Sequence, residues 1–298
     1  MKPSVWPVSE TFAAEIGDLD LSQPLSEADW QMVEEAFRTY AVLVFPDQRI
    51  SQQQHVDLAL RFGPIDGSMV VDMTDAKSRI RADIADVSNL DWNGEIYAED
   101  DRLRLFGHAN RLWHTDSSFK KVPAKASLLF IRKIPPVGGH TEFADMRAAW
   151  DALPQARQKE IDGLVAMHSI AYSRQKMGFE MTAEENEVLP PVPQTLVRRH
   201  ADSGRTSIYV ASHAGEIDGM SEADGKALLA ELLAFGTQRQ FVYSHRWRAN
   251  DLVIWDNRCT LHRGTTFDDK RWRRDAQRAT VMDVAPTCEQ EGIDAAAE

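Results

Sequence analysis

The residues best suited to metal chemistry are His114 and Asp116, in the sequence Trp-His-Thr-Asp at 113–116. Side chains two positions apart in an extended segment point to the same face, so this imidazole and carboxylate can bind one metal ion. Two further His-x-Asp pairs begin at His55 and His200. The first lies in a predicted helix, where the two side chains diverge, and the second runs into a glycine-containing turn. The pair at 114 and 116 is therefore the predicted metal site, and the alternative is an exposed histidine beside an aspartate in a loop.

His262 offers a third ligand. It follows an apolar strand that begins near residue 251 and the polar turn after that strand. Two histidines and one carboxylate on one octahedral face leave three positions open, which is diagnostic of non-haem Fe(II) oxygenases. Considered alone, His262 is more simply explained as a partly buried core histidine. The basic residues that follow it favour the metal site.

Arg274 and Arg278 lead directly into a strand-like run at 279–283. If the chain is already extended at Arg274, both guanidinium groups share a face and suit bidentate capture of carboxylates. The alternative is a solvated surface cluster, since Arg and Lys concentrate between residues 263 and 278. This cluster contrasts with the formal net charge of the chain, which is −12.

Composition narrows the class of protein. The 298 residues are 43% hydrophobic and include 8 Trp and 12 Phe, enough for a sizeable core, and we expect one domain over residues 1–288. The negative charge argues against nucleic acid or an anionic membrane as a partner. Because no long apolar run and no signal-peptide pattern occurs, we expect a cytoplasmic protein whose two cysteines are reduced thiols. The sequence leaves open whether the chain forms a homo-oligomer.

Hydrophobic periodicity predicts strands interrupted by helices. The predicted helices span 25–40, 51–61, 144–153, 155–167 and 221–235, and the predicted strands span 41–45, 126–132, 207–211, 240–245, 251–255 and 279–283. Residues 66–110 are predicted to form a long loop or lid, and 289–298 a disordered acidic tail. Strands and helices do not alternate strictly and no Gly-x-Gly-x-x-Gly motif occurs, so the predicted fold is mostly β with inserted helices, a double-stranded β-helix or jelly roll.

In combination, these motifs resemble the taurine and 2,4-dichlorophenoxyacetate dioxygenase family, whose members depend on iron and 2-oxoglutarate. The resemblance extends from about residue 8 to residue 284. Its motifs are Trp-His-x-Asp at 113–116, Gly-Gly-x-Thr at 138–141, Ala-Asp-Met-Arg-Ala-Ala-Trp at 144–150, Trp-Asp-Asn-Arg-x-x-x-His at 255–262 and Arg-x-x-x-Arg-Ala-Thr at 274–280. It is closest to the branch that cleaves aryloxyacetates, through segments 116–119, 141–146 and 238–243.

The resemblance implies roles for the candidate residues. Fe(II) would be held by the three residues introduced above, His114, Asp116 and His262. Thr141 and Arg274 would bind the distal carboxylate of the cosubstrate 2-oxoglutarate, and Arg278 would take the acidic group of the primary substrate. His213 follows a predicted strand and is expected to line the substrate pocket, with a surface position as the alternative. His200 matches a family position near the core, one layer behind the ligands.

The implied reaction uses dioxygen and 2-oxoglutarate to hydroxylate a small anionic substrate, with succinate and CO2 as products. An aryloxyalkanoate such as 2,4-dichlorophenoxyacetate would be hydroxylated beside its ether oxygen, and the hemiacetal would collapse to a phenol and glyoxylate. A sulfonate such as taurine, or another carboxylate, is the first alternative, because arginine binds planar and tetrahedral oxyanions alike. A non-enzymatic jelly-roll module that binds anions is the second.

Two departures from the family pattern concern the loops. One extra residue separates His262 from the arginine pair. Around 70–72 and 94–95, where the aryloxyacetate enzymes place lysines near the pocket, this chain is apolar or acidic. The sequence therefore leaves the physiological substrate and its stereochemistry open.

Overall fold

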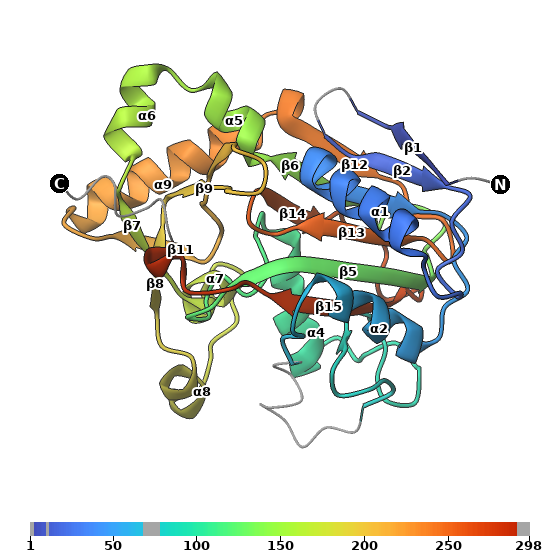
Figure 1. The fold of residues 1–298 in the computed structure, drawn as a ribbon. Helices are drawn as coiled ribbons and strands as arrows, with labels where there is room; N and C mark the ends of the chain where they lie inside the picture. Colours follow the sequence, from blue (N-terminus) through green and yellow to red (C-terminus); the bar gives the residue numbers. More distant parts are fainter. Residues whose placement is uncertain (1–2, 10–11, 68–77, 291–298) are drawn as a thin grey trace.

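The structure is a computed structural model that describes residues 3–9, 12–67 and 78–290. Its main sheet consists, in spatial order, of β1 (Ser4–Pro7), β2 (Ala14–Gly17), β3 (Val42–Phe45), β13 (Leu252–Asp256), β5 (Ala124–Lys133), β15 (Asp275–Met282) and β4 (Ala85–Asp86). Neighbouring strands are antiparallel except β2 and β3. The long strands β5 and β15 lie side by side through the centre of the molecule (Figure 1).

Shorter sheets complete the β framework. They are, again in spatial order, β12 (Val242–His245), β6 (Thr141–Asp145) and β14 (Thr260–Gly264); β11 (Ala214–Ile217), β7 (Val165–His168) and β8 (Val192–Thr195); and β10 (Thr206–Ile208) with β9 (Val197–Arg199). Phe143 of β6 packs against Val44, Leu129 and Trp255 of the main sheet. Two sheets packed face to face make the jelly roll that the sequence predicts.

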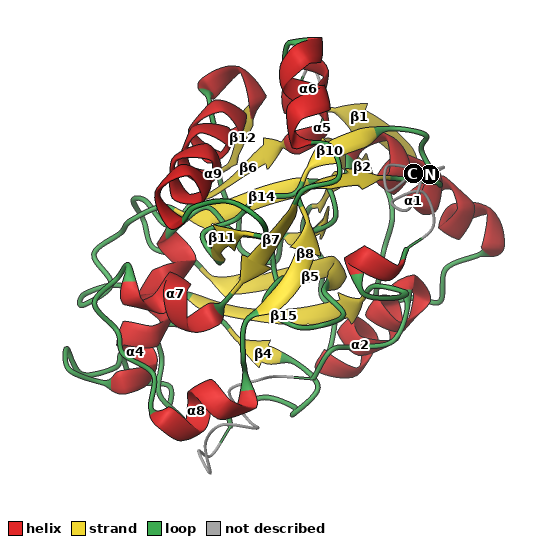
Figure 2. Ribbon diagram, turned by 90° about the vertical axis from the view of Figure 1, so that its left-hand side faces the viewer, coloured by secondary structure: helices red, strands yellow, loops and turns green. Residues whose placement is uncertain are grey.

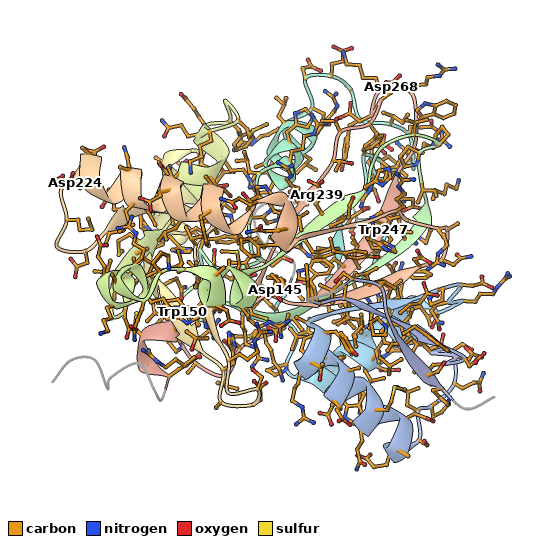
Figure 3. The ribbon with its side chains drawn as sticks, turned by 90° about the horizontal axis from the view of Figure 1, so that it is seen from above. Asp145, Trp150, Asp224, Arg239, Trp247 and Asp268 are labelled. Carbon is orange, nitrogen blue, oxygen red and sulfur yellow. The ribbon has the colours of Figure 1, made fainter. Side chains whose placement is uncertain are left out.

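Helices surround these strands (Figure 2). They are α1 (Glu27–Tyr40), α2 (Gln52–Phe62), α4 (Arg102–Gly107), α5 (Met146–Ala152), α6 (Gln155–Ile161), α7 (Ile170–Gln175), α8 (Ala183–Val188) and α9 (Glu222–Gly236). Asp145, labelled in Figure 3, caps α5 by accepting a hydrogen bond from the backbone N–H of Arg147. Of the residues that the structure describes, no helix is long and apolar enough to cross a membrane.

The main sheet is buried on both faces, as its nearly continuous apolar strands require. On β3, Leu43 and Phe45 pack into one core cluster with side chains of α1 and α2, whereas Val42 and Val44 point into the jelly roll. The same alternation on β5 places Leu128 outward and Leu129 inward. This alternation follows from the two-residue period of a strand, and it fixes the register in which β5 and β15 present side chains to the interior.

Capping explains where the predicted early helices begin. Ser51 Oγ accepts from the Gln54 N–H at 3.2 Å, and the Gln54 side chain accepts from the Ser51 N–H at 2.8 Å, the capping box expected from Ser-x-x-Gln. Helix α1 begins after Ser26, whose side chain caps Asp29 N, and it ends where Ala41 adopts a left-handed φ of 59°. The helix boundaries at both places agree with the sequence prediction.

The predicted helix over 155–167 is wrong in its second half. Helix α6 ends at Ile161, Gly163 has a φ of 80°, and Val165–His168 forms strand β7 between β8 and β11. The positive φ breaks the helix, and the alternating burial of β7 is that of a strand. The helical interpretation overlooked both the glycine and this two-residue period.

The predicted lid contains more regular structure than a loop. Within 66–110 it includes β4, which pairs with β15 through Ala85 and Arg278, and the unpredicted helix α4. Residues 68–77 of this lid, among them the departure at 70–72, lie outside the described residues, as do residues 291–298 of the predicted tail.

Truncating a core side chain of the main sheet should destabilise the fold. Leu43 of β3 is fully buried in the core cluster that β3 shares with α1 and α2, so Leu43→Ala should lower the free energy of unfolding by about 2–5 kcal/mol through lost burial and a residual cavity. Urea denaturation followed by circular dichroism measures this change. The control Leu60→Ala removes an exposed leucine of α2 and should change the value by less than about 0.5 kcal/mol. Equal losses in the two variants would contradict this account of the core.

Candidate metal centre and active site

Two histidines far apart in sequence are paired through their backbones. His114 N donates to His262 O at 3.0 Å, and His262 N donates to His114 O at 2.8 Å, an isolated antiparallel bridge beside β14. The ring centroids lie 4.1 Å apart. Mutual hydrogen bonds of this kind set the relative position of both side chains before any metal is considered.

Asp116 completes a buried cluster with these two rings. His262 Nε2 lies 3.6 Å from Asp116 Oδ2, His114 Nε2 lies 4.0 Å from Asp116 Oδ1, and one ligand atom from each residue falls within 4.8 Å of the others. His114 Nδ1 is 2.8 Å from Leu112 O, and by donating there it would leave the lone pair of Nε2 free for a metal. The three residues therefore fit a single divalent cation.

The protonation states also suit a cation. Burial lowers the pKa of His114 and holds that of His262 well below its ordinary value, so both rings are neutral near pH 7. Burial alone would raise the pKa of Asp116, but the positive charge of Arg278 and the hydrogen bond from Ser127 outweigh it and lower the pKa to about 2. Two neutral imidazoles and one carboxylate are the forms that bind metal ions.

Asp116 does not lie in the extended segment that the sequence predicts. Only His114 is in a bridge, and Asp116 begins a turn in which Ser117 has a φ of 54°. The side chain of Asn257 holds this turn: its Oδ1 accepts from Asp116 N at 3.1 Å, and its Nδ2 donates to Ser127 Oγ, which in turn donates to Asp116 Oδ2 at 2.7 Å. The carboxylate is therefore oriented by β5 and by the turn after β13 rather than by strand geometry.

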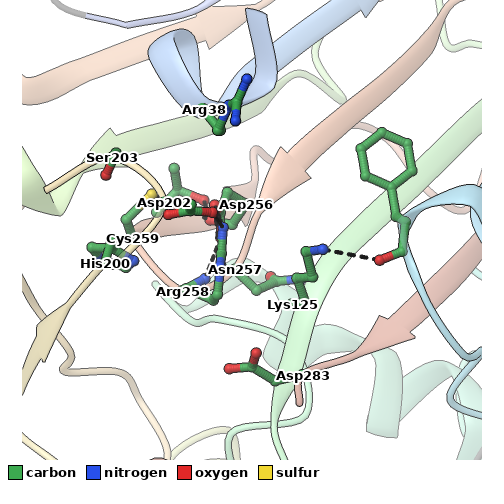
Figure 4. Close-up of polar contacts among 12 residues, drawn as sticks. Arg38, Lys125, His200, Asp202, Ser203, Asp256, Asn257, Arg258, Cys259 and Asp283 are labelled. Atoms are coloured by element: carbon green, nitrogen blue, oxygen red, sulfur yellow. Dashed lines mark hydrogen bonds and ion pairs between the residues drawn. The ribbon is translucent and has the colours of Figure 1, made fainter. Parts of the chain in front are cut away.

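Asn257 had no role in the sequence interpretation, although it lies in the Trp-Asp-Asn-Arg motif. Its turn is fixed by two ion pairs of Arg258, which donates to the buried Asp256 at 2.7 Å and to the exposed Asp202 at 2.9 Å (Figure 4). Asn257 N also donates to Lys125 O at 2.9 Å. Buried charges that are paired on both sides resist displacement, so the amide that orients Asp116 is itself held in place.

A cavity of about 320 Å³ opens beside the cluster, between the sheets and the lid. All the site residues predicted from the sequence line it: His114, Asp116, Thr141, His213, His262, Arg274 and Arg278. His200 is not among the lining residues and bonds Ser207 Oγ through Nε2 at 2.9 Å. The turn at 94–95, where the aryloxyacetate enzymes have a lysine, is likewise not part of this lining.

Thr141 and Arg274 present unused donors to the cavity. Thr141 Oγ1 accepts from Trp247 Nε1 at 3.0 Å, which leaves the threonine O–H free to donate elsewhere. Arg274 Nη1 donates to Val87 O at 3.1 Å, and within the described part of the chain no carboxylate pairs with this guanidinium. Burial lowers the pKa of Arg274 to about 10. A partly buried cation without a counter-ion is suited to an anionic ligand.

Arg278 and His213 approach the metal cluster from two sides. Arg278 forms an ion pair with Asp116 through Nη1. His213 is buried rather than exposed at a strand end; its Nδ1 lies 3.0 Å from Ser118 Oγ and its ring packs edge-on against His114 at 6.2 Å. Burial, with the charges of neighbouring residues, lowers the pKa of His213 well below its ordinary value, so the ring is neutral.

A jelly roll with a buried His-x-Asp and distant His beside an arginine-lined cavity defines the class of Fe(II)- and 2-oxoglutarate-dependent dioxygenases. Residues 4–280 match the family described as "Taurine catabolism dioxygenase TauD, TfdA family". The chain belongs to this family. It is an oxidoreductase that uses Fe(II) as cofactor and 2-oxoglutarate as cosubstrate.

Named relatives cover nearly the whole chain. It is 43% identical over 281 residues to an alpha-ketoglutarate-dependent 2,4-dichlorophenoxyacetate dioxygenase of Cupriavidus pinatubonensis, covering 94% of this chain and 97% of that protein; alpha-ketoglutarate is 2-oxoglutarate. It is 36% identical to an (S)-phenoxypropionate/alpha-ketoglutarate-dioxygenase of Sphingobium herbicidovorans, covering 88% and 89%. The crystal structure of AAD-2 with Mn(II) and N-oxalylglycine superposes with a TM-score of 0.89 at 44% identity, covering 97% of this chain and all of that one.

Removing any member of the cluster should abolish metal-dependent activity without unfolding the protein. His114→Ala, Asp116→Ala and His262→Ala should each reduce Fe(II)-dependent succinate formation by more than about 100-fold, because loss of a ligand exceeds the 10–100-fold effect of losing a group that supports one. Succinate release and Fe(II) binding by equilibrium dialysis measure the effect. Asp57→Ala, at an exposed position of another His-x-Asp pair, is the matched control. Near wild-type turnover in any of the three variants would exclude that residue as a ligand.

Proposed function

We propose that this enzyme hydroxylates an aryloxyalkanoate, of which 2,4-dichlorophenoxyacetate is the model substrate. The observation that supports it best is the cavity, in which arginines adjoin a wall of apolar side chains that includes Phe106, Phe119 and Leu129. An aryl ring suits the apolar wall and a carboxylate suits the guanidinium groups. The named activities of the relatives agree with this substrate class.

His114, Asp116 and His262 are proposed to hold Fe(II), which would activate dioxygen for the oxidative decarboxylation of 2-oxoglutarate. Arg274 would pair with the distal carboxylate of 2-oxoglutarate, and the free O–H of Thr141 would donate to the same group. One oxygen atom of O2 enters succinate and the other enters the substrate. Hydroxylation at the carbon between the ether oxygen and the carboxylate gives a hemiacetal, which breaks at the C–O bond into a phenol and glyoxylate.

Arg278 and His213 are proposed to position the substrate. Arg278 already pairs with Asp116, so an acidic group that reaches it would lie next to the metal cluster. Because Nδ1 of His213 faces Ser118, its Nε2 is the nitrogen left for a ligand. Phe119 packs against the His213 ring at 5.1 Å and extends the apolar wall on that side.

The lid is proposed to shield the reaction from water. Asp269, in the loop before Arg274, pairs with Arg104 of α4 at 3.0 Å and with Arg111 at 2.7 Å. The side chain of Asn89 donates to the backbone carbonyls of Asp269 and Trp272. These contacts join the lid to the loop that leads into Arg274, and an enclosed site protects reactive intermediates from hydrolysis.

A sulfonate is the second candidate substrate, and the family description, which names taurine, is the observation in its favour. A non-enzymatic binding module is excluded by membership of an enzyme family. A cytoplasmic location and the absence of nucleic-acid and membrane partners stay predictions of the sequence, which leaves the formation of a homo-oligomer open.

Loss of Arg274 should weaken the binding of the cosubstrate 2-oxoglutarate specifically. Breaking a desolvated charged contact costs about 2–5 kcal/mol, so Arg274→Ala should raise the 2-oxoglutarate concentration needed for half-maximal succinate release by about 30-fold or more. The control is Arg273→Ala, an adjacent exposed arginine that pairs with Glu95 outside the cavity. An unchanged 2-oxoglutarate titration for Arg274→Ala would remove Arg274 from this role.

The wild-type enzyme should prefer aryl acids to taurine. Burial of the ring against the apolar wall is worth about 2–3 kcal/mol, so kcat/KM for 2,4-dichlorophenoxyacetate or phenoxyacetate should exceed that for taurine by at least about 10-fold. Phenol, sulfite and succinate release are measured side by side. Preference for taurine would make the sulfonate the substrate class and leave the iron chemistry unaffected.

A further inference from the structure

A buried arginine, Arg174, also lines the cavity and was not expected from the sequence. It lies on α7, its side chain is 7% exposed, and it lines the same cavity as His114, His213 and Arg278. Its guanidinium carbon lies 4.0 Å from the centroid of the Phe106 ring of α4. The aromatic contact accounts for one face of the group and supplies no counter-charge.

Nothing in the described part of the chain neutralises Arg174. No carboxylate forms an ion pair with it, and its buried Nε has no hydrogen-bond partner. Burial, followed by the positive charge of Arg278, lowers the pKa of Arg174 to about 10, and Asp116 offsets only part of this. Burying a cation without a partner is costly, and such groups in cavities are commonly completed by a ligand.

Arg278 differs from Arg174 in this respect, because Asp116 already occupies one of its nitrogens. An anion that enters between the two arginines would meet one free guanidinium and one that is shared. It would also relieve the repulsion between them. The uncompensated charge of Arg174 therefore makes it the stronger attraction for an incoming carboxylate.

The position of Arg174 is fixed relative to the substrate side of the cavity. Ser169 N, at the start of α7, donates to His213 O at 2.9 Å, and Ser173 Oγ lies 3.0 Å from Ser212 Oγ. Lys176 Nζ donates to Ser212 O at 2.8 Å. Helix α7 is thus attached to the segment that includes His213, so Arg174 and His213 form one rigid wall.

We infer that Arg174 determines specificity by binding the carboxylate of the primary substrate from α7, in the cavity that it shares with Arg278. This inference rests on the proposed function, since it names the group that recognises the acid of an aryloxyalkanoate. It assigns Arg274 to the cosubstrate and Arg174 to the substrate, while Arg278 is shared between the substrate and Asp116.

The experiment compares an acid with its neutral amide. Protein loaded with Fe(II) and 2-oxoglutarate is titrated anaerobically by calorimetry with 2,4-dichlorophenoxyacetate and with 2-(2,4-dichlorophenoxy)acetamide. Arg174→Gln should raise Kd for the acid by about 30-fold or more, as expected for loss of a desolvated charged contact, and change Kd for the amide by less than about 3-fold. Arg174→Lys, which keeps the charge, should recover part of the affinity for the acid. Kd for 2-oxoglutarate should stay within about 3-fold of wild type.

The matched control is Arg102→Gln. Arg102 lies on α4 and stacks on Phe179, whose ring packs against Phe106, but it pairs with Glu185 and is not among the cavity residues. It should leave both affinities unchanged. Thermal unfolding of each variant identifies a loss of fold, and Arg174→Lys then serves as the test variant.

Equal weakening of acid and amide by Arg174→Gln would make the residue structural and overturn the inference. Selective loss of 2-oxoglutarate affinity would assign Arg174 to the cosubstrate and overturn it as well. If the wild-type protein binds neither aryl compound, the proposed function fails together with the inference. If the wild type binds the acid and Arg174→Gln binds it equally well, only the inference fails.

Discussion

The site depends on the backbone pairing of His114 with His262. These residues are far apart in the chain, and their two mutual hydrogen bonds, formed where β14 meets the segment before Asp116, hold the ring centroids 4.1 Å apart. β14 in turn pairs with β6, so the same strand register that aligns His262 also places Thr141 at the edge of the cavity. A one-residue slip would turn every side chain of β14 to the opposite face and would remove both the ligand and the cavity wall.

The carboxylate of Asp116 is positioned by side-chain hydrogen bonds rather than by strand pairing. Asp116 lies in a turn, where backbone geometry alone fixes little, and Asn257 supplies the missing constraint through its amide. The ion pairs of Arg258 then fix the turn that holds Asn257. Sheet pairing therefore sets the histidines, while buried polar contacts set the aspartate, and both devices converge on one metal position.

The sequence predicted the parts of this arrangement that local patterns determine. The capping box at Ser51, the apolar strands predicted at 41–45 and 251–255 and observed at 42–45 and 252–256, and the chemistry of the His-x-Asp pair are all local signals, and the strand and turn before His262 indicated the third ligand. Helix α4 was missed because packing against neighbouring segments decides its conformation, whereas strand β7 was missed because Gly163 and the two-residue period that follows it were overlooked. The environments of Asn257 and Arg174 were not predictable either, since an amide or an arginine in a sequence does not reveal which turn it supports or whether its partner is absent. These environments depend on the tertiary structure and not on local sequence patterns.

The unpaired arginines of the cavity affect the stability of the protein. Most arginines of this acidic chain pair with carboxylates, as Arg198 does with Asp283 and Arg147 with Asp145, whereas the buried Arg174 and the partly buried Arg274 have no carboxylate partner among the described residues. Each unpaired guanidinium destabilises the free protein, and an anion that binds only the folded state offsets that cost. The cavity is therefore least stable when empty, and the dianionic cosubstrate and the acidic substrate are the ligands whose charges match it. Arg174 and Arg274 therefore serve ligand binding at a cost in the free energy of unfolding. The core clusters on both faces of the main sheet offset that cost.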